Sequence, residues 1–123
     1  MAVKMVVGSL AGAHCSLSPV ADLLRVMSVE EKVGQLFMVH FHGETANKDA
    51  EALVQRAKVG GVIYYNWANG LSSPQQVHTL SSGLQELTTH NPNPIPLLIA
   101  GDQEGGIVAR FKSGFIPFIK NKF

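Results

Sequence analysis

Short apolar runs alternate along this chain with segments whose apolar residues recur every three or four positions. The apolar runs lie at 37–41, 62–65 and 97–100, and each has the length and composition of a buried strand. Helical periodicity covers 46–57 and 77–87, where the apolar side chains fall on one face. This alternation is typical of parallel βαβ units and predicts an α/β fold.

A capping signal marks the start of a helix before the first apolar run. Ser28 and Glu31 form a capping box, in which the hydroxyl and the carboxylate each accept a backbone N–H. Val29, Val33 and Leu36 then share one face of the predicted helix. We therefore expect ordered structure to begin near Ser28.

The helix over 77–87 has the same kind of start signal. Ser73 suits the N-cap, Pro74 suits the first helical position, and Gln76 can complete a second capping box. The preceding helix is expected to stop at Gly60–Gly61, and the segment 66–70 predicts a loop.

These boundaries divide the chain into residues 1–26, a loose N-terminal extension, residues 27–118, a single domain, and residues 119–123, a divergent basic tail. The apolar stretch after Lys4 gives residues 1–19 the look of a weak signal peptide, but it is short and interrupted by glycine. We expect a cytoplasmic protein, with export as the alternative.

The amino-acid composition argues against several classes of partner and site. Ten Lys and Arg against nine Asp and Glu leave a net charge of +1, which gives no electrostatic reason to expect nucleic acid. One cysteine excludes a disulfide or a thiolate zinc cluster within these residues. No run approaches the ~20 apolar residues of a membrane span. The sequence leaves the oligomeric state open.

Polar and aromatic residues collect where the predicted strands end, at 40–44, 66–69 and 102–106. Parallel βα units bring these ends to one edge, where ligands bind. Asp102 directly follows an apolar run, and Arg110 can return its guanidinium to the same place. A carboxylate and an arginine together can bind vicinal sugar hydroxyls, whereas the alternative is that the acids of this loop only cap the next helix.

The other candidates in these segments are less specific. His40, His42 and Glu44 have a spacing that permits a metal site, but ordinary hydrogen bonds of strand-end histidines are the expectation, so we predict no metal. Trp67 is expected either to stack on a sugar or to cover the core. The glycines after the third run lack the spacing of a P-loop or a dinucleotide fingerprint, and we expect no cofactor.

Asp102 and Glu104 do not suit the paired carboxylates of a glycosidase. Such a pair must flank the bond that breaks, whereas residues at i and i+2 of an extended segment point the same way. Glu104 is expected instead to form hydrogen bonds within its own loop.

Four segments together resemble the N-terminal part of glycoside hydrolase family 3, and in particular its β-N-acetylhexosaminidases. They are Glu30–Leu36, Gly60–Ile63, Asp102–Gly106 and Arg110–Phe111. The similarity extends over about Met27 to Phe118. It implies an incomplete (β/α)8 TIM barrel, about the first three βα units, with Asp102 and Arg110 as substrate-binding residues. The implied reaction is retaining hydrolysis of terminal β-linked N-acetylglucosamine, from peptidoglycan fragments, through a covalent intermediate.

The chain departs from this family at several points. Gly101 stands where the family has an apolar strand residue, and Trp67 with its neighbouring asparagines replaces an arginine-containing loop. The family's aspartate nucleophile and histidine-centred acid/base lie on later segments without a counterpart here. The resemblance therefore implies a truncated enzyme with no catalytic residue, inactive alone, because three units cannot close a barrel. The alternatives are a non-catalytic sugar- or partner-binding fragment and an unrelated flavodoxin-like binding domain.

Overall fold

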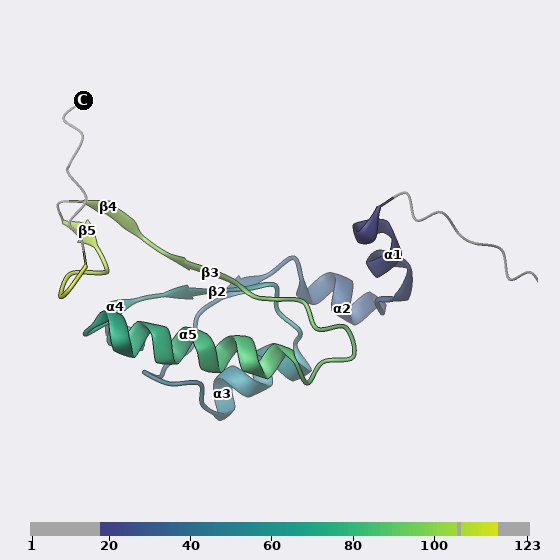
Figure 1. The fold of residues 1–123 in the computed structure, drawn as a ribbon, viewed down its shortest axis with the longest axis horizontal. Helices are drawn as coiled ribbons and strands as arrows, with labels where there is room; N and C mark the ends of the chain where they lie inside the picture. Colours follow the sequence, from purple (N-terminus) through teal and green to yellow (C-terminus); the bar gives the residue numbers. More distant parts are fainter. Residues whose placement is uncertain (1–17, 106, 116–123) are drawn as a thin grey trace, which may run out of the picture.

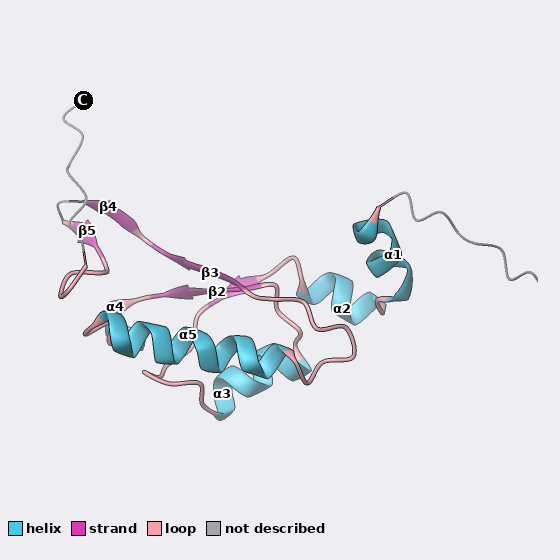
Figure 2. Ribbon diagram, viewed as in Figure 1, coloured by secondary structure: helices cyan, strands magenta, loops and turns pink. Residues whose placement is uncertain are grey.

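The computed structural model describes residues 18–105 and 107–115 (Figures 1 and 2). Its helices are α1 (Pro19–Val26), α2 (Val29–Gly34), α3 (Lys48–Glu51), the π-helical turn η1 that continues α3 (Ala52–Arg56), α4 (Asn66–Asn69) and α5 (Pro74–Thr88). The strands are β1 (Met38–Val39), β2 (Gly61–Tyr64), β3 (Leu98–Gly101), β4 (Gln103–Gly105) and β5 (Val108–Ala109). The predicted signal-peptide segment up to residue 17, Gly106 and the tail at 119–123 lie outside the described residues.

Strands β1, β2 and β3 form one parallel sheet in that order, with Val39 beside Val62 and Val62 beside Ile99. The predicted α/β fold with parallel strands is confirmed. A separate antiparallel pair, β4 and β5, follows β3, where the sequence predicted a loop. Among the described residues no helix is long and apolar enough to cross a membrane.

Helices α3 and α5 cover one face of the sheet (Figure 1). Side chains of alternate strand positions, such as Val62 and Tyr64, pack against Leu80 and Leu84 of α5 and against Val54 of η1. This alternation is what a strand with one helix-covered face requires. The predicted helical periodicities over 46–57 and 77–87 therefore identify the residues that form the core.

The opposite face of the sheet is open to solvent within the described chain. Met38 and Leu98 both pair with Gly61, and 45% and 68% of their surfaces are exposed. Phe37 is 56% exposed, and β1 contains two residues only. The prediction of a continuous buried strand over 37–41 is therefore wrong. A strand is present at Met38–Val39, but its length and burial depend on neighbours that periodicity does not reveal.

Structure begins before Ser28, because α1 covers part of the predicted loose extension (Figure 1). The Ser28–Glu31 capping box is confirmed: Ser28 N donates to Glu31 Oε2 at 2.8 Å, and Glu31 N donates to Ser28 Oγ at 3.2 Å. The apolar face of α2 is nevertheless exposed, with Leu36 just beyond it 83% accessible.

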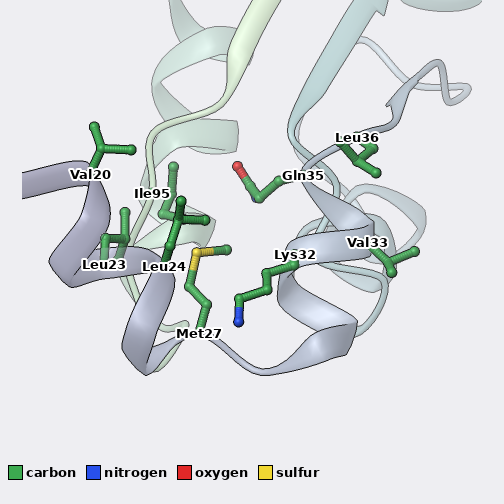
Figure 3. Close-up of a pocket in the computed structure, with 9 residues that line it drawn as sticks. All are labelled: Val20, Leu23, Leu24, Met27, Lys32, Val33, Gln35, Leu36 and Ile95. Atoms are coloured by element: carbon green, nitrogen blue, oxygen red, sulfur yellow. The ribbon is translucent and has the colours of Figure 1, made fainter.

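An apolar groove of about 470 Å³ lies between α1, α2 and the segment before β3 (Figure 3). Val20, Leu23, Leu24 and Met27 line it from α1 and its end, and Val33 and Leu36 line it from α2 and the residues just after it. Ile95 lines it from the segment before β3. We call this the amino-end groove, because α2 leads directly into the start of β1.

Two boundary predictions need correction near α5. Residues 66–69 form the short helix α4 instead of a loop. Ser73 caps α5 as predicted, with Gln76 N donating to its Oγ at 3.2 Å. The Gln76 side chain does not complete a capping box, because its Oε1 accepts from Ser72 N at 3.3 Å and not from the N-cap Ser73 N–H. Its Nε2 donates to the carbonyls of Glu44 and Asn69. It thus ties α5 to the loops that follow β1 and β2.

Candidate functional site

Polar and aromatic side chains meet at the carboxyl ends of the three parallel strands. Tyr65 directly follows β2 and Asp102 directly follows β3, while His40 directly follows β1. Because side chains alternate along a strand, these three residues point to the face opposite the core residues Tyr64 and Val39. The sequence predicts this edge as the binding edge. It places Tyr65 inside the second strand, however, and not among the candidate binding residues.

Asp102 and Arg110 lie together, as the sequence predicted. The β4–β5 hairpin returns the chain, so that Arg110 N donates to Asp102 O at 3.2 Å. Arg110 Nη2 is 3.5 Å from Asp102 Oδ2, and the side chains are 29% and 39% exposed. This separation exceeds that of a well-formed charge-assisted hydrogen bond, about 2.7–2.9 Å. Both groups therefore keep donors and acceptors for a further partner.

The chain positions Arg110 from two other directions. Its guanidinium carbon lies 5.7 Å from the centre of the Tyr65 ring, within reach of a cation–π interaction. Asn66 Nδ2 donates to the Arg110 carbonyl, which joins the hairpin to α4. Arg110 Nε is buried and has no hydrogen-bond partner among the described residues.

Gln103, and not Glu104, provides the hydrogen bonds that the structure gives within this segment. Its amide Nε2 donates to Phe111 O and its Oε1 accepts from Phe111 N, each at 3.0 Å. Glu104 is exposed. The expectation for Glu104 is therefore wrong, as is the alternative that these acids cap a helix, because β4 begins at Gln103.

Gly101 has a packing reason that the sequence did not reveal. A Cβ at this position would lie 2.6 Å from Phe111 Cε2, so the missing side chain makes room for that ring. Phe111 packs against the hydrophobic core, and β3 runs through Gly101. Gly101 therefore belongs to β3, and its lack of a side chain accommodates the Phe111 ring.

Four rings form an aromatic cluster beside the Asp102–Arg110 pair: His40, His42, Tyr65 and Trp67. The Tyr65 and Trp67 rings stack with their centres 5.3 Å apart and their planes 19° apart. His40 and His42 each lie 5.2 Å from the Trp67 ring. Trp67 remains 63% exposed, so it does not serve as a cover for the core.

Asn69 fixes the loops that carry this cluster, and the sequence analysis did not single it out. Its side chain is fully buried. Its Nδ2 donates to the carbonyls of Phe41 and Gly43 at 3.1 Å, and its Oδ1 accepts from Tyr65 N at 3.0 Å. A buried amide with such partners joins the end of β1 to the end of β2.

The histidines do not form a metal site with Glu44. In the part of the chain that the structure describes, no three His, Cys, Asp or Glu side chains come together in a way that could bind a metal ion. The Glu44 carboxylate lies against Gly70, where a Cβ would be 2.8 Å from its Oε1. The alternative of a metal bound by His40, His42 and Glu44 is therefore wrong for these residues.

The amino-end groove does not suit a sugar. Of the described residues that line it, Lys32 and Gln35 are polar and the others are apolar. Figure 1 shows α1 and α2 at the opposite end of the sheet from β4 and β5. The Asp102–Arg110 pair and the aromatic cluster, not the groove, therefore form the candidate binding site.

Known proteins of similar sequence identify relatives of this chain. Two curated proteins named beta-hexosaminidase, from Alkalilimnicola ehrlichii and Nitrosomonas eutropha, are each 37% identical to this chain over 78 residues. The alignment covers 63% of this chain and 20% of each relative. This chain thus spans about a fifth of the length of the curated relatives it matches.

Solved structures show the same relationship. A glycoside hydrolase family 3 beta-N-acetylglucosaminidase from Paenibacillus sp. str. FPU-7 superposes with a TM-score of 0.71 and 41% sequence identity, over 77% of this chain and 18% of that one. LpqI of M tuberculosis superposes with a TM-score of 0.52 and 28% identity, over 76% of this chain and 24% of that one.

The family described as glycosyl hydrolase family 3 N terminal domain matches residues 28–120, which is most of the sequence. The alternative of an unrelated flavodoxin-like domain is therefore wrong. The match, the parallel α/β fold and the similar solved structures lead to one conclusion: this chain belongs to glycosyl hydrolase family 3, within its N-terminal domain.

Proposed function

We propose that this chain is the sugar-binding part of a retaining β-N-acetylhexosaminidase that acts on terminal β-linked N-acetylglucosamine. One observation carries the proposal: Asp102 and Arg110 lie together, part-exposed, at the carboxyl ends of the parallel strands. The names of the similar proteins support the same substrate class.

The two side chains divide the recognition of the sugar between them. Asp102 accepts hydrogen bonds from ring hydroxyls, and Arg110 donates to hydroxyl oxygens of the same ring. Each charge-assisted hydrogen bond contributes about 1.5–3 kcal/mol where water is excluded. Tyr65 and Asn66 keep Arg110 in place, so little side-chain freedom is lost when the sugar binds.

Within this proposal the chain by itself binds sugar but does not hydrolyse it. The described sheet has three parallel strands, which do not close into a barrel, and the proposed architecture is therefore an incomplete TIM barrel of about three βα units. No residue of the chain is assigned as nucleophile or acid/base. A non-catalytic sugar-binding role is the alternative reading of the same site.

Calorimetric titration with N-acetylglucosamine tests the binding step. We expect saturable binding by the full chain, and a loss of affinity of about tenfold or more in Arg110→Ala and in Asp102→Asn. Arg56→Ala and Asp49→Asn are the matched controls, because both residues are exposed on η1 and α3, away from the site. No binding by the wild-type chain, or equal loss in the controls, would contradict the proposal.

The catalytic part of the proposal has its own assay. We expect the full chain to release no nitrophenol from 4-nitrophenyl N-acetyl-β-glucosaminide. Turnover that disappears in Asp102→Ala would show that the chain is active alone. A thermal melt of each variant, with a cooperative transition, verifies that the protein compared is folded.

Substrate source and location are further parts of this proposal. Terminal N-acetylglucosamine of peptidoglycan fragments is the proposed natural glycan, which competition by such fragments in the titration tests. The proposed location is the cytoplasm, supported by the short, glycine-interrupted apolar stretch near the N-terminus, with export as the alternative. Cell fractionation with an antibody against the chain distinguishes the two.

A further inference from the structure

We propose that Trp67 is a stacking platform for a second sugar, so that the site binds a β-linked disaccharide of N-acetylglucosamine more tightly than the monosaccharide. This inference rests on the proposed function, because it takes the Asp102–Arg110 pair as the place of the first sugar. Trp67 lies in α4, in the segment where the resembling family has an arginine-containing loop, so this chain presents an aromatic side chain there in place of a charged one.

The surroundings of Trp67 leave part of its ring open. Tyr65 covers one side by stacking, and the two histidines of the aromatic cluster lie against it at larger interplanar angles, 70° and 58°. The residue is still 63% exposed. An indole that is supported by other rings and remains accessible is suited to contact with a ligand, since aromatic residues bury a large area with few rotatable bonds.

Sugars offer a matching surface. One face of a β-linked pyranose presents C–H groups, while its hydroxyls project from the rim. An aromatic ring binds the C–H face, and charged groups bind the hydroxyls. At this site the two kinds of group are separate but adjacent: Tyr65 contacts the Arg110 guanidinium at 5.7 Å and the Trp67 ring at 5.3 Å. A chain of two sugars would use both.

The cluster is also built to keep its shape before a ligand arrives. Asn69 ties the ends of β1 and β2 together through three hydrogen bonds, and Gly43 N donates to Ala68 O at 2.9 Å. Asn47 Nδ2 donates to His42 O at 2.8 Å. Preorganised rings lose little conformational entropy on binding, so contact area at Trp67 is converted into affinity.

The experiment compares N-acetylglucosamine with N,N′-diacetylchitobiose, its β-linked dimer. The sequence contains one tryptophan, so intrinsic fluorescence excited at the indole band reports on Trp67 alone. We expect the dimer to bind about tenfold more tightly than the monomer and to change the emission of Trp67. Calorimetry on the same samples gives the affinities for variants without tryptophan.

Two variants and one control identify the residue responsible. Trp67→Ala is expected to bind the dimer no more tightly than the monomer, whereas Trp67→Phe keeps most of the gain for the dimer because a ring remains. Phe37→Ala is the matched control: Phe37 is 56% exposed before β1 and should leave the gain intact. Far-ultraviolet circular dichroism of each variant verifies the fold.

The outcomes separate this inference from the proposed function. Monomer binding with no gain for the dimer, or a gain that persists in Trp67→Ala, overturns the platform and leaves the sugar-binding proposal in place. No detectable sugar binding by the wild-type chain overturns both the platform and the sugar-binding proposal. A Trp67-dependent gain for the dimer, with monomer binding that depends on Arg110, supports both.

Discussion

The two ends of the parallel strands present surfaces of opposite kinds. At the carboxyl ends, polar and aromatic side chains contact one another, as in the stacked pair Tyr65–Trp67 and the pair Asp102–Arg110. At the amino ends, α1 and α2 expose apolar side chains around the amino-end groove, among them Leu24 at 48% and Leu36 at 83%.

The two ends differ in how far the described residues satisfy and cover their side chains. The carboxyl end contains its own supporting contacts and presents a surface suited to a small polar ligand. The amino end and the bare face of the sheet present apolar area that the described residues do not cover. Apolar area of this kind on a folded domain is typical of surfaces that pack against more protein.

The largest effect is expected at the centre of the carboxyl-end contacts. Asn69→Ala removes the partners of Phe41 O, Gly43 O and Tyr65 N, all close to a fully buried position. Unsatisfied buried polar groups cost about 1–3 kcal/mol each, so we expect the free energy of unfolding to fall by about 3 kcal/mol in urea denaturation. Asn69→Asp keeps an acceptor for Tyr65 N but places a carboxylate oxygen against the Phe41 and Gly43 carbonyls at a fully buried position, so it should lose at least as much stability. A fall below about 1 kcal/mol would mean that these loops do not depend on Asn69.

A close backbone contact at the amino end should also be sensitive. A Cβ on Gly34 would collide with the carbonyl oxygens of Ala57 and Lys58, where α2 meets the end of η1. Overpacking of this kind costs about 1–3 kcal/mol, so Gly34→Ala should destabilise the chain by that amount. Val33→Ala, next along α2 and 48% exposed, is the control and should change stability by less than about 0.5 kcal/mol. Equal effects of the two variants would contradict the close packing.

A smaller, pH-dependent effect is expected at the start of α2. The Ser28 backbone N–H and the Asn93 side chain hydrogen-bond the Glu31 carboxylate and lower its pKa below the ordinary value of 4.5. A lowered pKa means that the carboxylate stabilises the fold above that pH, and that this contribution is lost as the pH falls through the folded-state pKa.

Urea denaturation of the wild-type chain and of Glu31→Gln at a series of pH values tests this contribution. The wild-type chain should lose more stability than the variant between about pH 6 and pH 3. Parallel pH profiles would show that the capping carboxylate does not contribute to folding.

The smallest effect is expected on the exposed rim of the amino-end groove. Leu36→Ala removes a side chain that is 83% accessible, so the free energy of unfolding should change by less than about 0.5 kcal/mol. A larger loss, measured by the same denaturation, would mean that another part of the chain covers Leu36. The amino end would then not differ from the carboxyl end in having uncovered apolar side chains.

Local sequence signals predicted the features that depend on neighbours in the chain. The Ser28–Glu31 capping box, the Ser73 cap and the buried strand β2 are all set by short-range patterns. The pairing of Asp102 with Arg110 was predictable as well, because the segment after a buried run must turn back at the binding edge.

Long-range packing decided the features that the sequence did not reveal. Gly101 is small because Phe111 lies over it, and Asn69 is buried because two loops meet around it. Neither contact leaves a periodic pattern. The exposure of Phe37 had no signal for the same reason, since an apolar run does not reveal whether other residues cover it.

The order of the strands in space is also their order along the chain, β1, β2, β3. Each strand therefore finds its pairing partner in the unit made just before it, β2 beside β1 and β3 beside β2. A sheet of this order can assemble on the ribosome one unit at a time, because no early strand waits for a late one to fill a gap beside it. Assembly of this sheet therefore has a direction, from β1 through β2 to Leu98–Gly101 of β3.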